Sequence, residues 1–411
     1  MERIVQRPGA LDVHKASVTA CVRIWHGRRL EERVQEFPTT VRGLLALADW
    51  LEAHEVEQVV MEATGVYWKP VWAVLEDRFA LMLVNARHVK QVPGRKTDVL
   101  DAQWLCQLLE AGLLKASFVP PKPIRTLRNL TRYRKTQIQA RQREALRLHK
   151  AIEDTGIKLA CVATDIMGKS GRAMLDALVS GTKDPEVLAD LAHGQLRKKL
   201  PALREALEGR FDAEHRLVIG AILAHIDFLD AQIDRLSDAI DEHIAPFAAA
   251  RDLLMTIPGV QQRTAEVLIA EIGADMTAFP TAAHLASWAG VCPGNDQSAG
   301  KRRSGQTRKG SKWLRATLTE ASLAATRKKD TYLAARYQRL RGRRGHSKAL
   351  TAVSHCILTA AWHMLATGET YRERGADYYT RQNPDRATRS LVRRLQALGH
   401  HVTIEPREAA A

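Results

Sequence analysis

The first 118 residues alternate short apolar runs with amphipathic stretches, and this alternation restricts the fold more than any other feature of the chain. Strands are expected at residues 13–24, 33–37, 58–61 and 80–84, and helices at residues 41–54, 66–77 and 99–112. Because strand and helix signals follow one another in turn, the region predicts an α/β sheet layered with helices.

Four acidic residues lie near the ends of these expected elements. Asp12 is inside Gly-Ala-Leu-Asp-Val-His-Lys, which indicates a first strand, and Glu62 ends the second apolar run, just before Ala-Thr-Gly. Asp98 and Asp101 stand three residues apart at the start of a helical pattern, so both side chains point to one face. Carboxylates at strand ends and on a packing helix match the ribonuclease-H-like architecture.

Such a set of carboxylates is suited to metal-dependent cleavage of nucleic acid. Two Mg²⁺ ions about 3.5–4 Å apart neutralise charge on the attacking and the leaving oxygen of a phosphodiester, and hard cations take oxygen ligands. The alternative is that Asp98 and Asp101 are ordinary acids of a helix N-terminus, with Asp12 and Glu62 as solvent-facing strand ends. The cost of burying an unpaired carboxylate in an apolar strand favours the metal site.

The chain is basic, and its charge is concentrated in two segments. The 411 residues carry a formal charge of +16 with a pI near 9.8. Residues 122–150 contain ten Lys or Arg and one acid, and residues 301–348 contain sixteen and two. The two segments sum to +23, which leaves −7 for the remainder. This concentration predicts two phosphate-binding surfaces rather than a generally basic one, and neither segment has the aromatic face of a membrane-surface helix.

The five cysteines, at positions 21, 106, 161, 292 and 356, are widely spaced and include no Cys-x-x-Cys pair. This pattern indicates neither a disulfide framework nor a zinc site. The N-terminus lacks the apolar core of a signal peptide, and no apolar run is expected to reach the length that spans a bilayer. The sequence therefore predicts a cytoplasmic protein with no membrane partner.

A long helical region follows Pro120, Pro121 and Pro123. Its most regular feature is an apolar stripe with alternating spacings of four and three residues: Ile222, Ile226, Leu229, Ile233, Leu236 and Ile240. Such a heptad seam requires a partner helix. The partner is either the 124–152 helix folded back or a second chain, and a plain core helix of a bundle also fits the pattern.

Two motifs in the last third bear on nucleic acid. Ile257-Pro-Gly-Val, with an apolar helix after it, resembles a helix-hairpin-helix, in which backbone N–H groups bind phosphate. A Pro-Gly turn between packed helices is also common without that role. Ser298 stands in the basic loop Gln-Ser-Ala-Gly-Lys, where a hydroxyl is placed to attack phosphorus. Ser304 and Ser311 share this neighbourhood, and serines in basic loops usually just hydrogen-bond phosphate.

Taken in order, these motifs resemble the DEDD transposases of the IS110 insertion-sequence family, which are serine-using, bridge-RNA-guided recombinases. The resemblance rests on Leu-Asp-Val-His-Lys, Met-Glu-Ala-Thr-Gly, Lys-Thr-Asp-Val-Leu-Asp-Ala, Ile-Pro-Gly-Val and Gln-Ser-Ala-Gly-Lys. It covers about residues 3 to 370 in the same order. Ala299 stands where relatives often have a glycine.

The resemblance implies an α/β plus all-α protein with several domains. Residues 1–120 would form a RuvC-like domain that holds Mg²⁺, or Mn²⁺ in its place, through Asp12, Glu62, Asp98 and Asp101. Residues 121–250 would form a helical coiled-coil connector, and residues 251–370 a mainly helical transposase domain with a helix-hairpin-helix-like element and the catalytic Ser298. Residues 371–411 are expected to be a peripheral tail.

The resemblance also implies the chemistry and the partners. Ser298 would form a covalent phosphoserine with a DNA strand, which conserves the energy of the bond for religation. The partners would be DNA, as element ends and target, and a non-coding guide RNA that reads sequence by pairing. The composite site would require a homo-oligomer, a dimer or a tetramer, because it needs at least two protomers.

The residues alone are also compatible with two other classes of protein. A metal-dependent nuclease or junction resolvase would use the four carboxylates but not Ser298. A nucleic-acid-binding protein with a decayed site would need neither. The intact acidic set argues against decay, and a serine loop inside a second DNA-binding domain argues against simple hydrolysis.

Overall fold

The computed structural model describes residues 4–89, 98–294 and 296–405, without the side chains of residues 87, 88, 98–100, 296–298, 302 and 303. The chain divides into two compact units. The first ends at Val119 and the second begins at Pro120.

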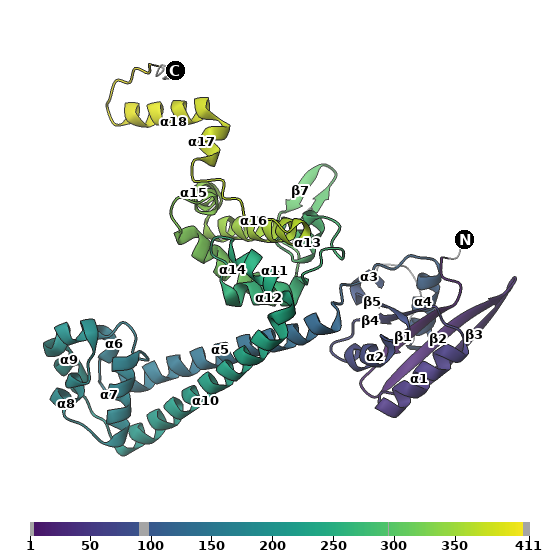
Figure 1. Cartoon of the computed structure of the whole chain (residues 1–411), viewed down its shortest axis with the longest axis horizontal. Coiled ribbons are helices and arrows are strands. Elements are labelled where there is room, and N and C mark those ends of the chain that lie inside the picture. Colours follow the sequence, from purple (N-terminus) through teal and green to yellow (C-terminus); the bar gives the residue numbers. More distant parts are fainter. Residues whose placement is uncertain (1–3, 90–97, 295, 406–411) are drawn as a thin grey trace. The chain divides into compact units, whose positions relative to one another are not determined.

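The first unit is built on a mixed five-stranded sheet with the strand order β3-β2-β1-β4-β5 (Figure 1). β1, β2 and β3 pair antiparallel, whereas β4 runs parallel to β1 and β5 parallel to β4. The strands are β1 Pro8–Val13, β2 Ser17–His26, β3 Arg29–Pro38, β4 Gln58–Glu62 and β5 Ala80–Val84. One strand was expected over residues 13–24, but β1 ends at Val13 and β2 begins only at Ser17, so the start of this prediction was wrong. The His14 N–H donates to the Ser17 carbonyl (2.9 Å) and closes a turn between β1 and β2.

Helices cover both faces of this sheet: α1 Val41–Ala53, α2 Trp68–Leu75, α3 Ala86–Val89 and α4 Asp98–Glu110. Side chains alternate between the faces of a strand. Leu11 and Val13 of β1 accordingly belong to the core with α1 and α2, whereas Ala10 belongs to the core with α4. A mixed sheet with helices on both faces is consistent with the predicted ribonuclease-H-like architecture.

α4 runs antiparallel to β1. The Cys106 thiol donates to the Pro8 carbonyl (3.2 Å), and the Ile4 N–H donates to the Glu110 carbonyl (3.0 Å). The buried Arg23 of β2 donates to the Glu110 carboxylate (2.8 Å). The C-terminal half of α4 is therefore fixed over the start of β1, and its first turn is directed toward the end of β1.

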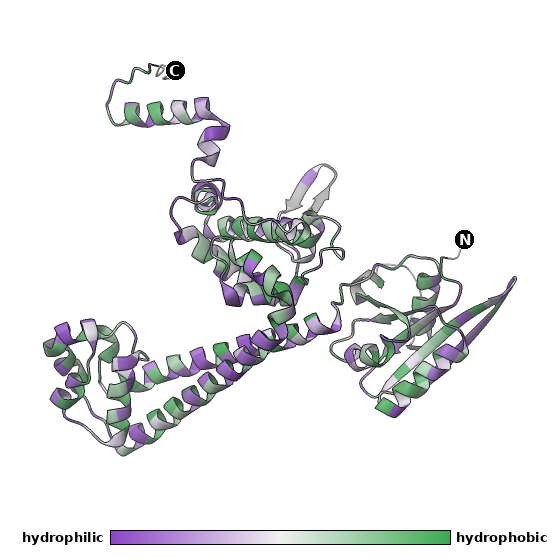
Figure 2. Cartoon of the chain, viewed as in Figure 1, coloured by the Kyte–Doolittle hydropathy of each residue, from purple (hydrophilic) through white to green (hydrophobic). Residues whose placement is uncertain are grey.

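The second unit begins with two long helices, α5 Lys122–Asp154 and α10 Ala213–Ile244 (Figure 1). α10 makes its most extensive contacts with α5 of the same chain, and the predicted seam residues Ile226, Leu229, Ile233 and Ile240 are buried. The partner of the seam is thus the folded-back helix. Hydrophilic residues prevail along α5 with hydrophobic ones between them (Figure 2).

A small helical lobe connects α5 to α10. It consists of α6 Leu159–Val162, α7 Lys169–Ser180, α8 Pro185–Asp190, the 3-10 helix η1 Gly194–Lys199 and α9 Leu200–Leu207. Its apolar residues form one core with Leu148 and Ile152 of α5 and with Ile219 and Leu223 of α10.

The rest of the second unit is a helical bundle with one hairpin. Its elements are η2 Ala245–Phe247, α11 Ala248–Met255, α12 Gln262–Ile272, α13 Ala282–Trp288, β6 Asp296–Ser298, β7 Lys301–Ser304, α14 Lys312–Arg327, α15 Tyr332–Arg344 and α16 His346–Thr367. Among the described helices, α16 alone is long and apolar enough to cross a membrane by length and composition, contrary to the expectation from the sequence. Its buried face packs against α11, α13, α14 and α15, so it is the central helix of this bundle.

The C-terminal segment adds α17 Tyr378–Gln382 and α18 Pro384–Ala397. Tyr379 stacks on Tyr332 of α15 (ring centroids 5.8 Å apart), and the Glu373 carboxylate accepts from the Tyr332 N–H (2.7 Å). α18 has no buried residue. The first part of the predicted tail is therefore attached to the bundle, and α18 is peripheral.

Candidate functional site

Asp12 and Glu62 lie on neighbouring strands at the same edge of the sheet. Leu11 of β1 pairs with Met61 of β4 in parallel register, so each carboxylate follows a paired residue by one position. Ala10 and Val60, two positions earlier, both face α4. By the alternation of strand side chains, Asp12 and Glu62 face α4 as well. The Asp12 side chain is 14% exposed, and the His14 Nε2 lies 3.1 Å from its Oδ2.

Asp98 and Asp101 occupy the first turn of α4. Ala102, Leu105 and Leu109 are buried against the sheet, and positions 98 and 101 belong to the same helical stripe. The distance from Cys106 back to Asp98 is about 12 Å of helix rise, and that from Pro8 to Asp12 is about 13 Å of strand. Since Cys106 contacts Pro8, the first turn of α4 reaches the edge at which Asp12 lies.

The donor set suits a hard divalent cation, because it consists of carboxylate oxygens. Asp101 is partly buried, as is Glu62. Among the side chains that the structure describes, no group of three or more His, Cys, Asp or Glu is arranged to hold a metal. The side chain of Asp98 lies outside the described residues. The described side chains therefore include three of the four predicted carboxylates, Asp12, Glu62 and Asp101.

Ser298 is the last residue of β6, and its side chain also lies outside the described residues. Its backbone pairs with Lys301 of β7 across a two-residue turn. Ala299 (φ 48°) and Gly300 (φ 74°) both have positive φ, as a type I′ hairpin turn requires. Glycine adopts this conformation freely, whereas Ala299 occupies it at a cost. The serine therefore stands beside a tight turn in a basic hairpin.

The two neighbouring serines are engaged in local structure. The Ser304 Oγ accepts from the Gln306 N–H (3.1 Å). The Ser311 Oγ caps α14 by accepting from the Leu314 N–H (3.3 Å), and it donates to the Glu271 carboxylate (3.0 Å). The sequence offers three serines as candidate nucleophiles, and these two form hydrogen bonds within the protein.

The Ile257-Pro-Gly-Val turn connects α11 to α12, and Ile257 and Val260 are buried. Gly259 has φ +88°, and a Cβ there would lie 2.4 Å from the Ala321 carbonyl oxygen. The turn therefore packs closely against α14, and this close packing requires a glycine at position 259.

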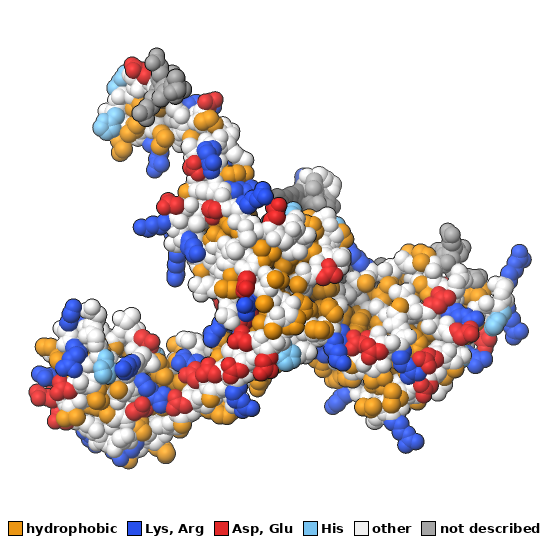
Figure 3. Space-filling model, viewed as in Figure 1, with side chains coloured by type: hydrophobic (Ala, Val, Ile, Leu, Met, Phe, Trp, Pro, Cys, Tyr) orange, Lys and Arg blue, Asp and Glu red, His pale blue; other side chains and the backbone are white. Residues whose placement is uncertain are grey.

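The first basic segment, predicted to bind phosphate, uses most of its cations inside the protein. Most of its cations bind acceptors within the protein: Arg125, Arg128, Arg132, Arg134, Lys135, Arg141 and Arg147. Lys122, Arg143 and Lys150 are exposed and make no ion pair with a described residue. Figure 3 shows acidic side chains along the α5–α10 pair, and Asp230 of α10 pairs with Arg141. Charge counted along α5 therefore overstates the number of free cations, because it omits the acceptors of the elements that pack on this helix.

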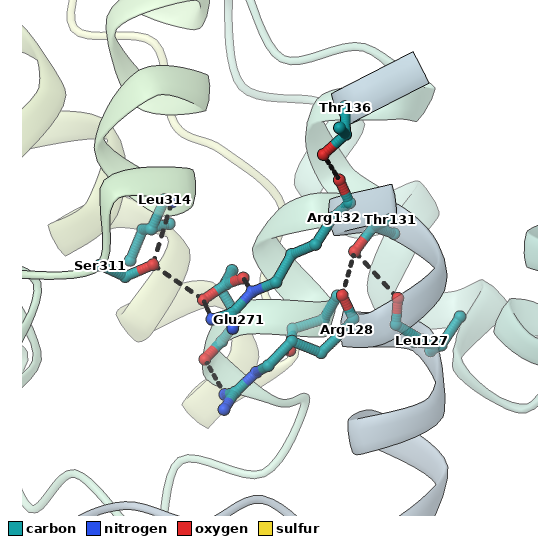
Figure 4. Close-up of polar contacts among 9 residues, drawn as sticks. Leu127, Arg128, Thr131, Arg132, Thr136, Glu271, Ser311 and Leu314 are labelled. Carbon is teal, nitrogen blue, oxygen red and sulfur yellow. Dashed lines mark hydrogen bonds and ion pairs between the residues drawn. The ribbon is translucent and has the colours of Figure 1, made fainter. Parts of the chain in front are cut away.

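Glu266 and Glu271 of α12 were missed by sequence reasoning, and they explain much of this pairing. The Glu271 carboxylate is fully buried and receives both Arg132 donors (2.7 and 2.9 Å) and the Ser311 hydroxyl (Figure 4). Arg128 donates to the Glu271 carbonyl (2.7 Å), and burial lowers the pKa of Arg128 to about 10. The only available signal was their place inside the apolar pattern of residues 265–272.

The second basic segment is open to solvent. None of its described Lys or Arg side chains forms an ion pair with a carboxylate of the described residues. Arg341, Arg343, Arg344 and Lys348 are exposed around the junction of α15 and α16, and Figure 3 shows basic side chains projecting from the region of α15. This corner fits the polyanion surface that the sequence predicts.

A mixed five-stranded sheet with carboxylates at the ends of two neighbouring strands is consistent with a ribonuclease-H-like domain. Comparison with known families gives the same class in more detail. The DEDD transposase model of IS110 elements matches residues 10–157, and the model described as "Transposase IS116/IS110/IS902 family" matches residues 251–338. The chain belongs to the IS110 family of transposases.

Two curated relatives support this assignment. The 43.6 kDa protein of insertion element IS110 from Streptomyces coelicolor is 34% identical over 149 residues, which are 36% of this chain and 34% of that protein. A protein of Sinorhizobium fredii designated a transposase, y4pF/y4sB, is 24% identical over 314 residues, which are 74% of this chain and 71% of that protein. The match thus spans about a third of the first relative and most of the second.

Proposed function

We propose that the chain is a DNA transposase that cleaves and rejoins the strands of an insertion sequence. The observation that carries the proposal is the register of β1 and β4. It brings Asp12 and Glu62 to one edge on the face covered by α4, whose first turn contains Asp98 and Asp101. Family membership supports the same reaction class.

Asp12, Glu62, Asp98 and Asp101 would hold Mg²⁺, or Mn²⁺ in its place. The metal would supply positive charge that stabilises the oxyanions of a phosphodiester under attack. Partial burial of Asp12 keeps this carboxylate away from bulk water, where competing solvation would weaken its attraction to a cation. His14, which contacts Asp12, orients that carboxylate.

Ser298 would act as the nucleophile in the second unit. Its Oγ forms a bond to phosphorus as one strand P–O bond breaks, the hydroxyl proton leaves, and the departing strand oxygen takes up a proton. The reverse attack by a strand hydroxyl regenerates the serine, so the energy of the phosphoester is retained for religation. The engagement of Ser304 and Ser311 in structural hydrogen bonds supports Ser298 over its neighbours.

The partners belong to the same proposal. DNA and a guide RNA both present phosphate backbones, and the exposed corner of α15 and α16 offers cations to either. A homo-oligomer would supply the carboxylate site and the serine of one composite site from different protomers.

The test is an adduct assay with Mg²⁺, element-end DNA and the RNA transcribed from the flanking non-coding region. Wild type should give a denaturant-stable protein–DNA adduct. Ser298→Ala should abolish the adduct, and Asp12→Ala should abolish both adduct and cleavage. Ser304→Ala is the matched control, since it removes a hydroxyl from the facing strand of the same hairpin, and it should keep the adduct.

A metal-dependent nuclease is the alternative that this assay separates, because the first unit contains all four carboxylates by itself. In that case wild type would release cleaved ends without an adduct. Cleavage would then survive Ser298→Ala and be lost in Asp12→Ala, which would rule out the serine mechanism.

A further inference from the structure

Two large side chains in the loop that follows β4 lie outside both cores of the first unit. Val66 is 61% exposed and Tyr67 is 40% exposed. The next residue, Trp68, packs against the core with α1 and α2. Apolar and aromatic surface left in water is unfavourable, and this exposed pair follows the proposed metal ligand Glu62 in the chain.

The backbone holds this pair at a fixed place next to Glu62. The Thr64 N–H donates to the Glu62 carbonyl (2.9 Å), and the Tyr67 N–H donates to the Thr64 carbonyl (3.2 Å). Gly65 has φ +55°, which permits the tight turn between them. The loop is therefore ordered by its own hydrogen bonds, and the side chains of Val66 and Tyr67 are presented within five residues of a proposed metal ligand.

Two exposed lysines follow the same strand ends as the pair and the carboxylates. Lys69 lies in the first turn of α2 and Lys15 in the turn between β1 and β2, and both are exposed without an ion pair to a described residue. β1 and β4 are neighbours, and both turns follow their last residues. The edge thus combines an aromatic ring and an aliphatic group with cations, which fits a nucleotide: its base has a π-face and its phosphate is anionic.

We propose that Val66 and Tyr67 form a platform on which one unpaired nucleobase stacks beside the carboxylate site, an inference that rests on the proposed function. A base inside a duplex is stacked on both sides and reaches no protein ring until it leaves the helix. The substrate at this site is therefore a DNA strand with at least one unpaired base next to the phosphate that is cleaved.

The test compares a single-stranded oligonucleotide carrying one 2-aminopurine with the fully paired duplex of the same sequence. The full-length protein is used with Ca²⁺ in place of Mg²⁺, and anisotropy and 2-aminopurine emission are recorded. Wild type should quench the single strand and bind it more tightly than the duplex. Tyr67→Ala should lose the quenching and bind the single strand roughly tenfold more weakly, with duplex affinity unchanged. Tyr67→Phe should behave as wild type, because it keeps the ring.

Tyr133→Ala is the matched control, since Tyr133 is an exposed tyrosine (57%) on α5. It should change neither signal. Equal losses for Tyr67→Ala and Tyr133→Ala, or equal losses on single strand and duplex, would overturn the platform. Circular dichroism of Tyr67→Phe and Tyr67→Ala should show the same fold, which assigns the loss to the ring.

Asp12→Ala separates this inference from the proposed function. It should abolish Mg²⁺-dependent cleavage and leave the quenching intact. Quenching by a wild-type protein that shows neither cleavage nor adduct would support the platform and refute the proposed function. Normal cleavage together with unchanged single-strand affinity in Tyr67→Ala would refute the platform and leave the function.

Discussion

The two basic segments of the chain have similar compositions, but their charges are used differently. In α5, Arg132 and Arg134 are bound to Glu271 and Glu266 of α12, and Arg141 is bound to Asp230 of α10. Around the junction of α15 and α16, the cations are exposed and make no ion pair with a carboxylate of the described residues. Burial decides the difference, because a charge taken out of water needs a partner, whereas an exposed one does not.

The comparison teaches that a run of arginines has two physical roles. In α5 the guanidinium groups join one long helix to the bundle, since their forked donors fit carboxylates that are themselves buried. In the second segment the charge is available to a polyanion. A net charge summed over a segment does not distinguish these roles.

The largest expected effect is in the first segment, at its most buried pair. Glu266→Ala should lower the free energy of unfolding by about 3–5 kcal/mol, because it leaves the Arg134 guanidinium buried without its carboxylate. Urea denaturation measures this loss. Arg143→Ala, an exposed position of the same helix, should change stability by no more than about 0.5 kcal/mol. Equal effects of the two substitutions would show that burial does not decide how much a charge on α5 contributes to stability.

The second prediction concerns nucleic-acid binding. Replacing Arg341, Arg343 and Arg344 by Ser should weaken binding of DNA or RNA by roughly tenfold to a hundredfold near 0.1 M salt. The slope of log affinity against log salt should fall by about 2.7, since each phosphate contact contributes about 0.9. Binding isotherms at several salt concentrations provide both values.

The matched control for that triple variant comes from the other segment. Lys122, Arg143 and Lys150 are exposed there and make no ion pair with a described residue, and replacing all three by Ser removes the same charge. We expect a clearly smaller loss of affinity and of slope. If both triple variants weaken binding equally, the two segments act alike on nucleic acid and the contrast fails.

The third prediction addresses the junction at which both segments meet. Ser311→Ala removes the cap of α14 and one donor to the buried Glu271, and it should cost about 1–2 kcal/mol of stability. Ser304→Ala removes one exposed hydrogen bond, so it should lower the free energy of unfolding by less. Thermal unfolding of the two variants against wild type tests this order, and the reverse order would contradict the assigned roles.

The smallest effect is a pH dependence in α16. Burial and the nearby Arg336 lower the pKa of His355 from its ordinary value of 6.5. The unfolded chain therefore binds this proton more readily than the folded chain, so stability is complete above pH 6.5 and declines as the pH falls below it. His355→Leu should reduce the fall in Tm between pH 7 and pH 5. An unchanged pH profile would show that His355 does not contribute.

Much of the first unit could be predicted from its sequence. Residues 41–53, 58–62 and 80–84 form the expected helix and strands, because their apolar periodicity and flanking turns are local properties. Asp12 and Glu62 are candidates for the same reason, as polar residues at the ends of apolar runs, and their role stays a prediction. The break between β1 and β2 was missed, since the turn at residues 14–16 is closed by one backbone hydrogen bond with no glycine or proline to mark it.

The sequence by itself determined most elements of the first unit, the candidate carboxylates, the serine loop and the total charge, since each depends on residue type and short spacing. Only the tertiary structure decided that the 222–240 seam packs on α5, that Glu271 and Glu266 pair with Arg132 and Arg134 of the basic helix, and that Val66 and Tyr67 remain exposed in the loop after Glu62. The physical reason is that pairing and burial depend on residues far apart in the chain, which only the packed fold brings within contact distance.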